Sequence, residues 1–254
     1  MREIIEDVYD CTDCNHKKSC DRIIYEQQQI PQIAVVLQNP GTPPEDIKEA
    51  ENKSLRGMNN AEKAAYHSGE LKKWIVSTSN GNQQFFLRFF SLLYKNNLIR
   101  SQIQNVQDLK MYVDSGQVFK DVYFTDGLKC RGETKDFSHK HFKYCMGKYL
   151  KREILALENL KLLFVFSTRS WEAFNSVYDL KQIQVSKVES KKVAQVHGYV
   201  FRTEIGVEEK NENRKVHVIP LVHMSQVSRN NTLRDSYFDY LEEGMEYFSK
   251  VVTI

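Results

Sequence analysis

The chain has 254 residues, of which 41% are hydrophobic and 27% are charged, and its formal net charge is +3. This length and composition are typical of a compact globular protein and argue against a disordered or fibrous chain, so we expect one domain over residues 1–254. A net charge of +3 is too small to indicate nucleic-acid binding by itself, although it allows a locally basic face.

No segment of the sequence has the length and apolar character of a membrane span. The two clearest apolar runs, Ile33–Leu37 and residues 160–166, have the length of strands. The N-terminal residues lack the basic and then apolar layout of a signal peptide. We therefore expect a cytoplasmic protein without a membrane partner, acting as a monomer.

The predicted elements alternate between helices and short apolar strands. In chain order they are a helix over 3–10, a strand at Ile33–Leu37, helices over 45–73 and 85–93, a strand over 118–125, a helix over 140–159, a strand at Leu162–Phe166, a helix from 169, strands over 196–204 and 216–220, and an amphipathic helix over 233–251. This alternation predicts an α/β fold with a mostly parallel sheet flanked by helices.

Four of the five cysteines form two pairs far apart in the sequence, Cys11 with Cys14 and Cys130 with Cys145. Thiols in a chain without a signal peptide are expected to be reduced, which favours metal ligation over disulfide bonding. Ligands this far apart favour a cluster held by tertiary contacts over a local zinc finger. Two alternatives stay open: Cys130 and Cys145 are ordinary buried thiols, or Cys20 replaces Cys14 as a ligand.

Three loops that follow predicted strands carry polar residues. In a parallel sheet such loops meet at the carboxyl edge, where ligands bind. Each loop alone is a common turn or holds a histidine of a structural kind, but together, with cysteines beside two of the elements, they indicate a functional site. The loops are Gln38-Asn39-Pro40-Gly41, Thr125-Asp126-Gly127, and the segment from Pro220 through His223 to Asn230.

The order and spacing of these motifs resemble the uracil-DNA glycosylase superfamily, and especially its iron–sulfur branches, over roughly residues 8–235. The resemblance implies a three-layer sandwich around a mostly parallel, four-stranded sheet. It also implies DNA as the partner and a structural 4Fe-4S cluster on the four paired cysteines, with zinc as the less favoured metal. The motifs are Cys11-x-x-Cys14, Leu37-Gln-Asn-Pro-Gly41, Thr125-Asp-Gly-Leu-Lys-Cys130, Cys145 and Pro220-Leu-Val-His-Met-Ser225. The segment His197-Gly198-Tyr-Val-Phe201 also resembles the glycine-containing strand that precedes the histidine loop in the family.

The activity implied by the resemblance is hydrolysis of the N-glycosidic bond of a flipped-out base. His223 would donate a hydrogen bond to the base carbonyl as negative charge develops there, and Asn39 would orient the attacking water. Gln38 and Gly41 would lie beside the base, with Gly41 allowing close approach of the backbone.

DNA contacts are expected from the loop after His223. Ser225 would donate to phosphate, Val227 would fill the space that the base leaves, and Arg229 would bind phosphate. The strand end at Ser167-Thr168 can supply further donors to phosphate. Met224 stands where the family has proline, which leaves the rigidity of this loop open. Lys129 and Arg131 are either further phosphate contacts or solvated charges.

Asp126 stands where the family has an asparagine that reads uracil. A carboxylate only accepts hydrogen bonds, which favours a base with an amino group, such as a modified cytosine or a purine. A protonated Asp126 would imitate asparagine but requires a raised pKa. Two alternatives remain: Asp126 caps its own turn, or the chain is a catalytically silent iron–sulfur protein that binds DNA.

The stacking partner of the base is open among three aromatic residues, Tyr66, Trp74 and Phe85. Phe86, Phe89 and Phe90 are instead expected in the core because of their helical spacing. The segment 45–82 is longer than the family connection. It is either decoration, which we favour, or a widening of the pocket.

Overall fold

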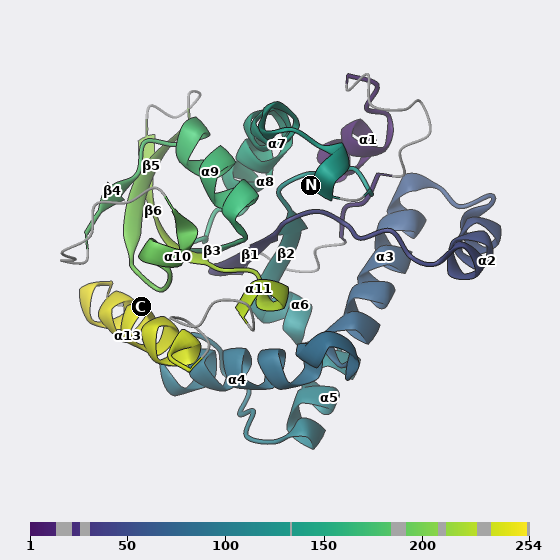
Figure 1. The fold of residues 1–254 in the computed structure, drawn as a ribbon. Helices are drawn as coiled ribbons and strands as arrows, with labels where there is room; N and C mark the ends of the chain where they lie inside the picture. Colours follow the sequence, from purple (N-terminus) through teal and green to yellow (C-terminus); the bar gives the residue numbers. More distant parts are fainter. Residues whose placement is uncertain are drawn as a thin grey trace.

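Figure 1 shows the computed structural model of the chain, which describes residues 1–13, 22–25, 31–132, 134–183, 192–207, 212–227 and 235–252. A mixed sheet of six strands, in the order β2-β1-β3-β6-β5-β4, runs through its middle. The strands are β1 (Ile33–Leu37), β2 (Val122–Asp126), β3 (Leu162–Phe166), β4 (Lys181–Gln182), β5 (Phe201–Val207) and β6 (Glu212–Leu221).

The neighbouring strands β2, β1, β3 and β6 are parallel, so their carboxyl ends lie along one edge of the sheet. Leu37 pairs with Asp126 at the ends of β1 and β2, and Phe166 pairs with Leu221 at the ends of β3 and β6. All five residues of β1, β2 and β3 are buried. Burial on both faces explains why these strands are mostly continuous apolar runs in the sequence.

The expected sheet of four strands is too small. β5 pairs antiparallel with β6 and β4 pairs antiparallel with β5, which extends the parallel part by two strands. The extension exists because the strands expected over 196–204 and 216–220 form an antiparallel hairpin and β4 adds to its outer edge. The centre of the charged stretch between them, residues 208–211, lies outside the described part of the chain.

Helices cover both faces of the sheet, which gives the three-layer arrangement. In Figure 1, α7, α8 and α9 lie on one side, and α4 and α13 lie on the opposite side. The helical elements are α1 (Arg2–Tyr9), α2 (Glu45–Leu55), α3 (Asn60–Ile75), η1 (Ser79–Gly81), α4 (Asn82–Lys95), α5 (Val106–Asp114), α6 (Val118–Asp121), η2 (Thr134–Asp136), α7 (His139–Cys145), η3 (Met146–Leu150), α8 (Lys151–Ala156), α9 (Thr168–Val177), α10 (Val193–Val196), α11 (Met224–Val227) and α13 (Tyr237–Val251).

Several boundaries differ from the sequence prediction. Residues 118–121 form the short helix α6 rather than the start of a strand. The single helix expected over 140–159 consists of α7, a π-helical turn η3 and α8. None of the helices within the described ranges is long and apolar enough to cross a membrane.

Candidate active site

The loops after β1 and β2 are joined by backbone hydrogen bonds and form one unit. The amide of Gly127 donates to the Leu37 carbonyl at 2.8 Å, and the amide of Leu128 donates to the Gln38 carbonyl at 3.1 Å. A Cβ atom at Gly127 would lie 2.4 Å from the terminal methyl of Met146, so a larger residue there would require the Met146 side chain to move. This docking fixes the position of Asp126 relative to the loop that carries Asn39.

The side chain of Asn39 has a fixed orientation. Its Nδ2 donates to the carbonyl of Gly132 at 2.8 Å and to that of Pro40 at 3.1 Å, while Gln38 Nε2 donates to Asn39 Oδ1 at 3.2 Å. The amide nitrogen is thus occupied, and the Oδ1 lone pairs are the part of Asn39 suited to accept from a water molecule. Gly41 is exposed and a Cβ atom there would meet nothing within 4 Å.

Asp126, the last residue of β2, is only 1% exposed. Within the described part of the chain neither of its carboxyl oxygens has a hydrogen-bond partner, so it does not cap its own turn. Burial raises the pKa of Asp126 to about 7, against the opposing effects of Lys129 and of the nearby Tyr25 hydroxyl. This residue is therefore a buried acid that titrates near neutral pH.

Lys129 belongs to a buried network rather than to the surface, which corrects both expectations for it. Its side chain is 2% exposed and its Nζ lies 2.6 Å from Oε1 of Glu153, which is fully buried. The other carboxylate oxygen of Glu153 accepts from the Tyr123 hydroxyl at 2.7 Å and from the Thr125 hydroxyl at 2.5 Å. Lys129 also donates to Thr125. The Lys129 ammonium is buried in an ion pair with Glu153 and is therefore not available to bind a DNA phosphate.

Arg131 is likewise paired with a carboxylate of the protein. Its Nη1 and Nη2 donate to the two oxygens of Glu51 in α2, at 2.5 and 3.0 Å. Glu51 also lies 3.4 Å from Nδ1 of His67 in α3, and burial lowers the pKa of His67 to about 4, so this imidazole is neutral. The segment 45–82 is thus not mere decoration, because α2 binds Arg131 in the loop after Cys130 and α3 contacts the same Glu51 carboxylate.

His223 follows β6, and burial lowers its pKa below its ordinary value. The preceding residue, Val222, is held through both its backbone amide and its backbone carbonyl. The Val222 amide donates to His197 Nδ1 at 3.2 Å, and the Val222 carbonyl accepts from the Tyr237 hydroxyl at 2.8 Å. His197 Nε2 in turn donates to the Tyr237 carbonyl at 2.9 Å. This clamp fixes the strand end from which His223 projects.

The sequence did not identify the clamp as part of the site, although its signal was the His197-Gly198 pair. Gly198 has a φ of +79° and a Cβ atom on it would lie 2.4 Å from the Tyr240 carbonyl, so glycine is required for this close approach to α13. The pKa of His197 is lowered to about 4 by burial, so its ring stays neutral and keeps one donor and one acceptor.

The expected DNA contacts lie in or beside α11. Val227 is partly exposed and packs against the core. Ser225 lies in α11, with its side chain outside what the structure describes, and Arg229 lies outside the described residues. Ser167, another expected phosphate contact, is fully buried and its hydroxyl accepts from the Ser170 amide, so it caps α9 instead.

The stacking candidates differ in their surroundings. Phe85 is buried in an aromatic cluster, with ring centroids 5.7 Å from Phe166 and 5.8 Å from Tyr237. Tyr66 and Trp74 are half-buried on α3, Tyr66 beside His67. Phe86, Phe89 and Phe90 are core residues, as their helical spacing predicted.

Three of the four paired cysteines lie in the described part of the chain. Cys130 and Cys145 are buried, and Cys11 is half-exposed. Burial, together with the interaction between its hydroxyl and the Cys11 thiol, raises the pKa of Tyr149. Cys14 and Cys20 lie outside the described residues, and among those described no three ligand side chains group as a metal site.

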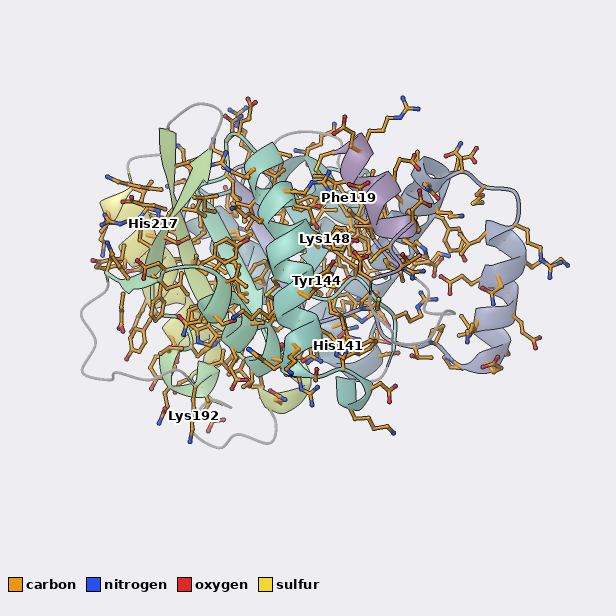
Figure 2. The ribbon with its side chains drawn as sticks, turned by 90° about the horizontal axis from the view of Figure 1, so that it is seen from above. Phe119, His141, Tyr144, Lys148, Lys192 and His217 are labelled. Atoms are coloured by element: carbon orange, nitrogen blue, oxygen red, sulfur yellow. The ribbon has the colours of Figure 1, made fainter. Side chains whose placement is uncertain are left out.

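Asp13 and Arg22, which flank the undescribed residues around Cys14, contact the two regions that carry Cys145 and Cys130. Asp13 accepts from the Tyr144 hydroxyl at 2.7 Å and pairs with Lys148. Figure 2 shows Tyr144 and Lys148 along the continuous helical segment of α7 and η3, beside α1. On the other side, Arg22 forms a β-bridge with Cys130. Asp13 thus contacts the helical segment that carries Cys145, and Arg22 pairs with Cys130 itself.

The fold and these strand ends define the class of the protein: an α/β protein with its candidate site at the carboxyl edge of a parallel sheet. The sequence profile of the Uracil DNA glycosylase superfamily matches residues 65–247, and the chain therefore belongs to this superfamily. The match includes Asp126, Cys130, Cys145 and His223, and it does not include Asn39 or the first cysteine pair. No curated protein matches the chain.

Proposed function

We propose that the chain is a monofunctional DNA glycosylase that hydrolyses the N-glycosidic bond of a flipped-out base in DNA. The observation that carries this proposal is the set of polar side chains at the carboxyl edge of the parallel strands. Asn39 follows β1, Asp126 ends the neighbouring strand β2, and His223 follows β6. Membership of a superfamily made up generally of DNA glycosylases supports the same activity.

The chemistry of these groups suits cleavage of a bond between a sugar and a base. When this bond breaks, the sugar becomes cationic and the base becomes anionic, so stabilising the departing base matters more than a strong nucleophile. A neutral His223 donates an N–H to the base carbonyl as that oxygen gains charge. Asn39 Oδ1 accepts from a water molecule and orients it for addition to the anomeric carbon, and the departing base takes up the proton that the water loses.

We also propose that Cys11, Cys14, Cys130 and Cys145 hold a 4Fe-4S cluster, which assigns the chain to an iron–sulfur branch of the superfamily. Its support is the burial of Cys130 and Cys145 and the anchoring of residues 13 and 22 beside them. A donor set of four thiolates fits such a cluster, and it also fits zinc. The cluster would be structural, because hydrolysis of this bond needs no electron transfer.

The loop after His223 is the proposed DNA contact. Val227 is an apolar side chain at the edge of the core, suited to replace an extruded base. Ser225 and Arg229 carry the donors that phosphate oxygens accept. The catalytically silent DNA-binding protein is the second candidate, and the observation that favours it is the aspartate at position 126.

An excision assay with His223→Ala tests the activity. The protein is purified anaerobically and given oligonucleotides that carry uracil, hypoxanthine, xanthine, cytosine or modified cytosines. We expect excision of one base class by the wild type and a loss of about 10²–10³-fold in the single-turnover rate of His223→Ala, with DNA affinity retained. His139→Ala, a change of an exposed histidine on α7, is the matched control. A wild type that binds DNA and excises no base would overturn the proposal in favour of the silent protein.

A further inference from the structure

The Asp126 carboxyl is a polar group of the site whose hydrogen-bonding capacity the described residues leave unused. It is 1% exposed, and neither oxygen has a hydrogen-bond partner among the described residues. Buried polar groups are nearly always hydrogen-bonded, and a buried charge without a partner is especially unfavourable. An unpartnered carboxyl at the carboxyl end of a parallel strand therefore indicates a group kept for a ligand.

The charged groups around Asp126 do not hold it as a carboxylate. Lys129 pairs with Glu153, and Arg131 is bound through both terminal nitrogens to Glu51. Glu153 adds a negative charge of its own, and the Tyr123 hydroxyl donates to Glu153 rather than to Asp126. The nearby cations are thus neutralised by other carboxylates, and burial keeps Asp126 protonated up to a pKa of about 7.

The Tyr25 hydroxyl lies near the Asp126 carboxyl and lowers its pKa, although the two groups do not meet the geometry of a hydrogen bond. Tyr25 comes from residues 22–25, is 8% exposed, and has a pKa raised well above its ordinary value by burial and by Asp126, so its hydroxyl stays protonated. The same short segment is bound to the loop after β2, since the Ile23 amide donates to the Lys129 carbonyl at 2.9 Å. Tyr25 is therefore placed to orient the Asp126 carboxyl.

We propose that Asp126, oriented by Tyr25, reads uracil as a neutral carboxylic acid. A carboxylic acid has one O–H donor and one carbonyl acceptor, which match O4 and N3–H of uracil in the way that an asparagine amide does. An apolar site can keep an aspartic acid neutral at pH 7 so that it donates a hydrogen bond, as is known from other enzymes. This inference rests on the proposed glycosylase activity and names its substrate and its pH dependence.

The chemistry of the leaving base selects uracil over cytosine. A neutral acid can also pair with N3 and the N4 amino group of cytosine, so hydrogen bonding alone discriminates weakly. The uracil anion spreads its charge over two carbonyl groups, whereas the cytosine anion has one. Uracil is the better leaving group, and we expect excision of uracil and retention of cytosine.

The test is the pH profile of single-turnover uracil excision by the full-length protein and two variants. For the wild type we expect the rate to fall by about tenfold per pH unit above about pH 7, as the acid ionises. Asp126→Asn should lack this descending limb, because an amide does not titrate. Tyr25→Phe should move the limb to higher pH, because the Tyr25 hydroxyl lowers the pKa of Asp126.

The outcomes separate this inference from the proposed function. Identical pH profiles for the wild type and Asp126→Asn would overturn the inference. It also fails if the wild type excises another base but never uracil, or if Asp126→Asn gains uracil excision that the wild type lacks at every pH; the glycosylase activity would then stand. Excision of no base at any pH by any of the three proteins would remove the proposed function itself.

Discussion

At the scale of the residue, the raised pKa of Asp126 makes folding stability depend on pH. The pKa of this group is raised from 3.8 to about 7 by burial. The folded chain therefore binds more protons than the unfolded chain between these values, and its stability falls as pH rises through this window. With about 1.36 kcal/mol for each pKa unit, the loss reaches roughly 4 kcal/mol.

Asp126→Asn removes this dependence. We expect the free energy of unfolding of the variant, relative to the wild type, to increase by roughly 4 kcal/mol between pH 4 and pH 8. Urea unfolding at a series of pH values measures this difference, and titrations of other groups cancel in the comparison. A difference that stays constant over this range would mean that Asp126 is ionised throughout.

The position of a site residue could be predicted where a sequence motif fixes it. Its interactions could not be predicted where the partner lies far away in the sequence. Asp126 ends a strand of clear apolar pattern, so its position was predictable. Its raised pKa depends on burial by distant parts of the fold, and no local pattern in the sequence shows that burial. The same holds for Arg131, which was expected on phosphate or in solvent because its partner Glu51 lies far from it in sequence.

At the scale of the elements, the ion pair between Lys129 and Glu153 joins the end of β2 to α8. Its side chains are 2% and 0% exposed. Lys129→Met would leave a buried carboxylate without its cation, and we expect roughly 3–5 kcal/mol of destabilisation in urea unfolding. The double change Lys129→Met with Glu153→Leu should recover part of this loss, because it removes both buried charges.

The control for this pair is Lys143→Met, a change of an exposed lysine on α7, which should stay within about 0.5 kcal/mol of the wild type. DNA binding is measured beside stability, over a range of salt concentrations. Lys129→Met should keep the wild-type salt slope. A variant that is as stable as the wild type but has a smaller slope would make Lys129 a phosphate contact after all.

The elements of the parallel sheet were predictable because a strand buried on both faces needs a continuous apolar run. Ile33–Leu37 and Leu162–Phe166 were located to the residue. The edge of the sheet was not, since β4 is Lys181–Gln182 and such short, polar edge strands carry no apolar signal. The helices α2 and α3 were visible as polar, helix-favouring sequence, but the link from Glu51 in α2 to Arg131 depends on tertiary contacts.

At the scale of the whole molecule, the N-terminal segment is attached to the body of the protein by ordinary contacts as well as by the proposed cluster. Ile4, Ile5 and Val8 of α1 are buried, and Asp7 pairs with Arg152 at 2.5 Å. Separate contacts hold Asp13 to Tyr144 and Arg22 to Cys130. If the proposed cluster forms, we therefore expect it to bind a protein body that is already folded.

This arrangement predicts different results for single cysteine changes. The wild type should carry about four iron atoms per chain and absorb in the visible range. Cys130→Ser and Cys14→Ser should lose the iron and melt at a lower temperature but remain folded, because the contacts of α1 persist. Cys20→Ser is the matched control and should keep both iron and absorbance. If Cys14→Ser retains iron and Cys20→Ser loses it, Cys20 is the ligand in place of Cys14. If the wild type is colourless and binds one zinc ion, the four cysteines form a zinc site instead of a cluster.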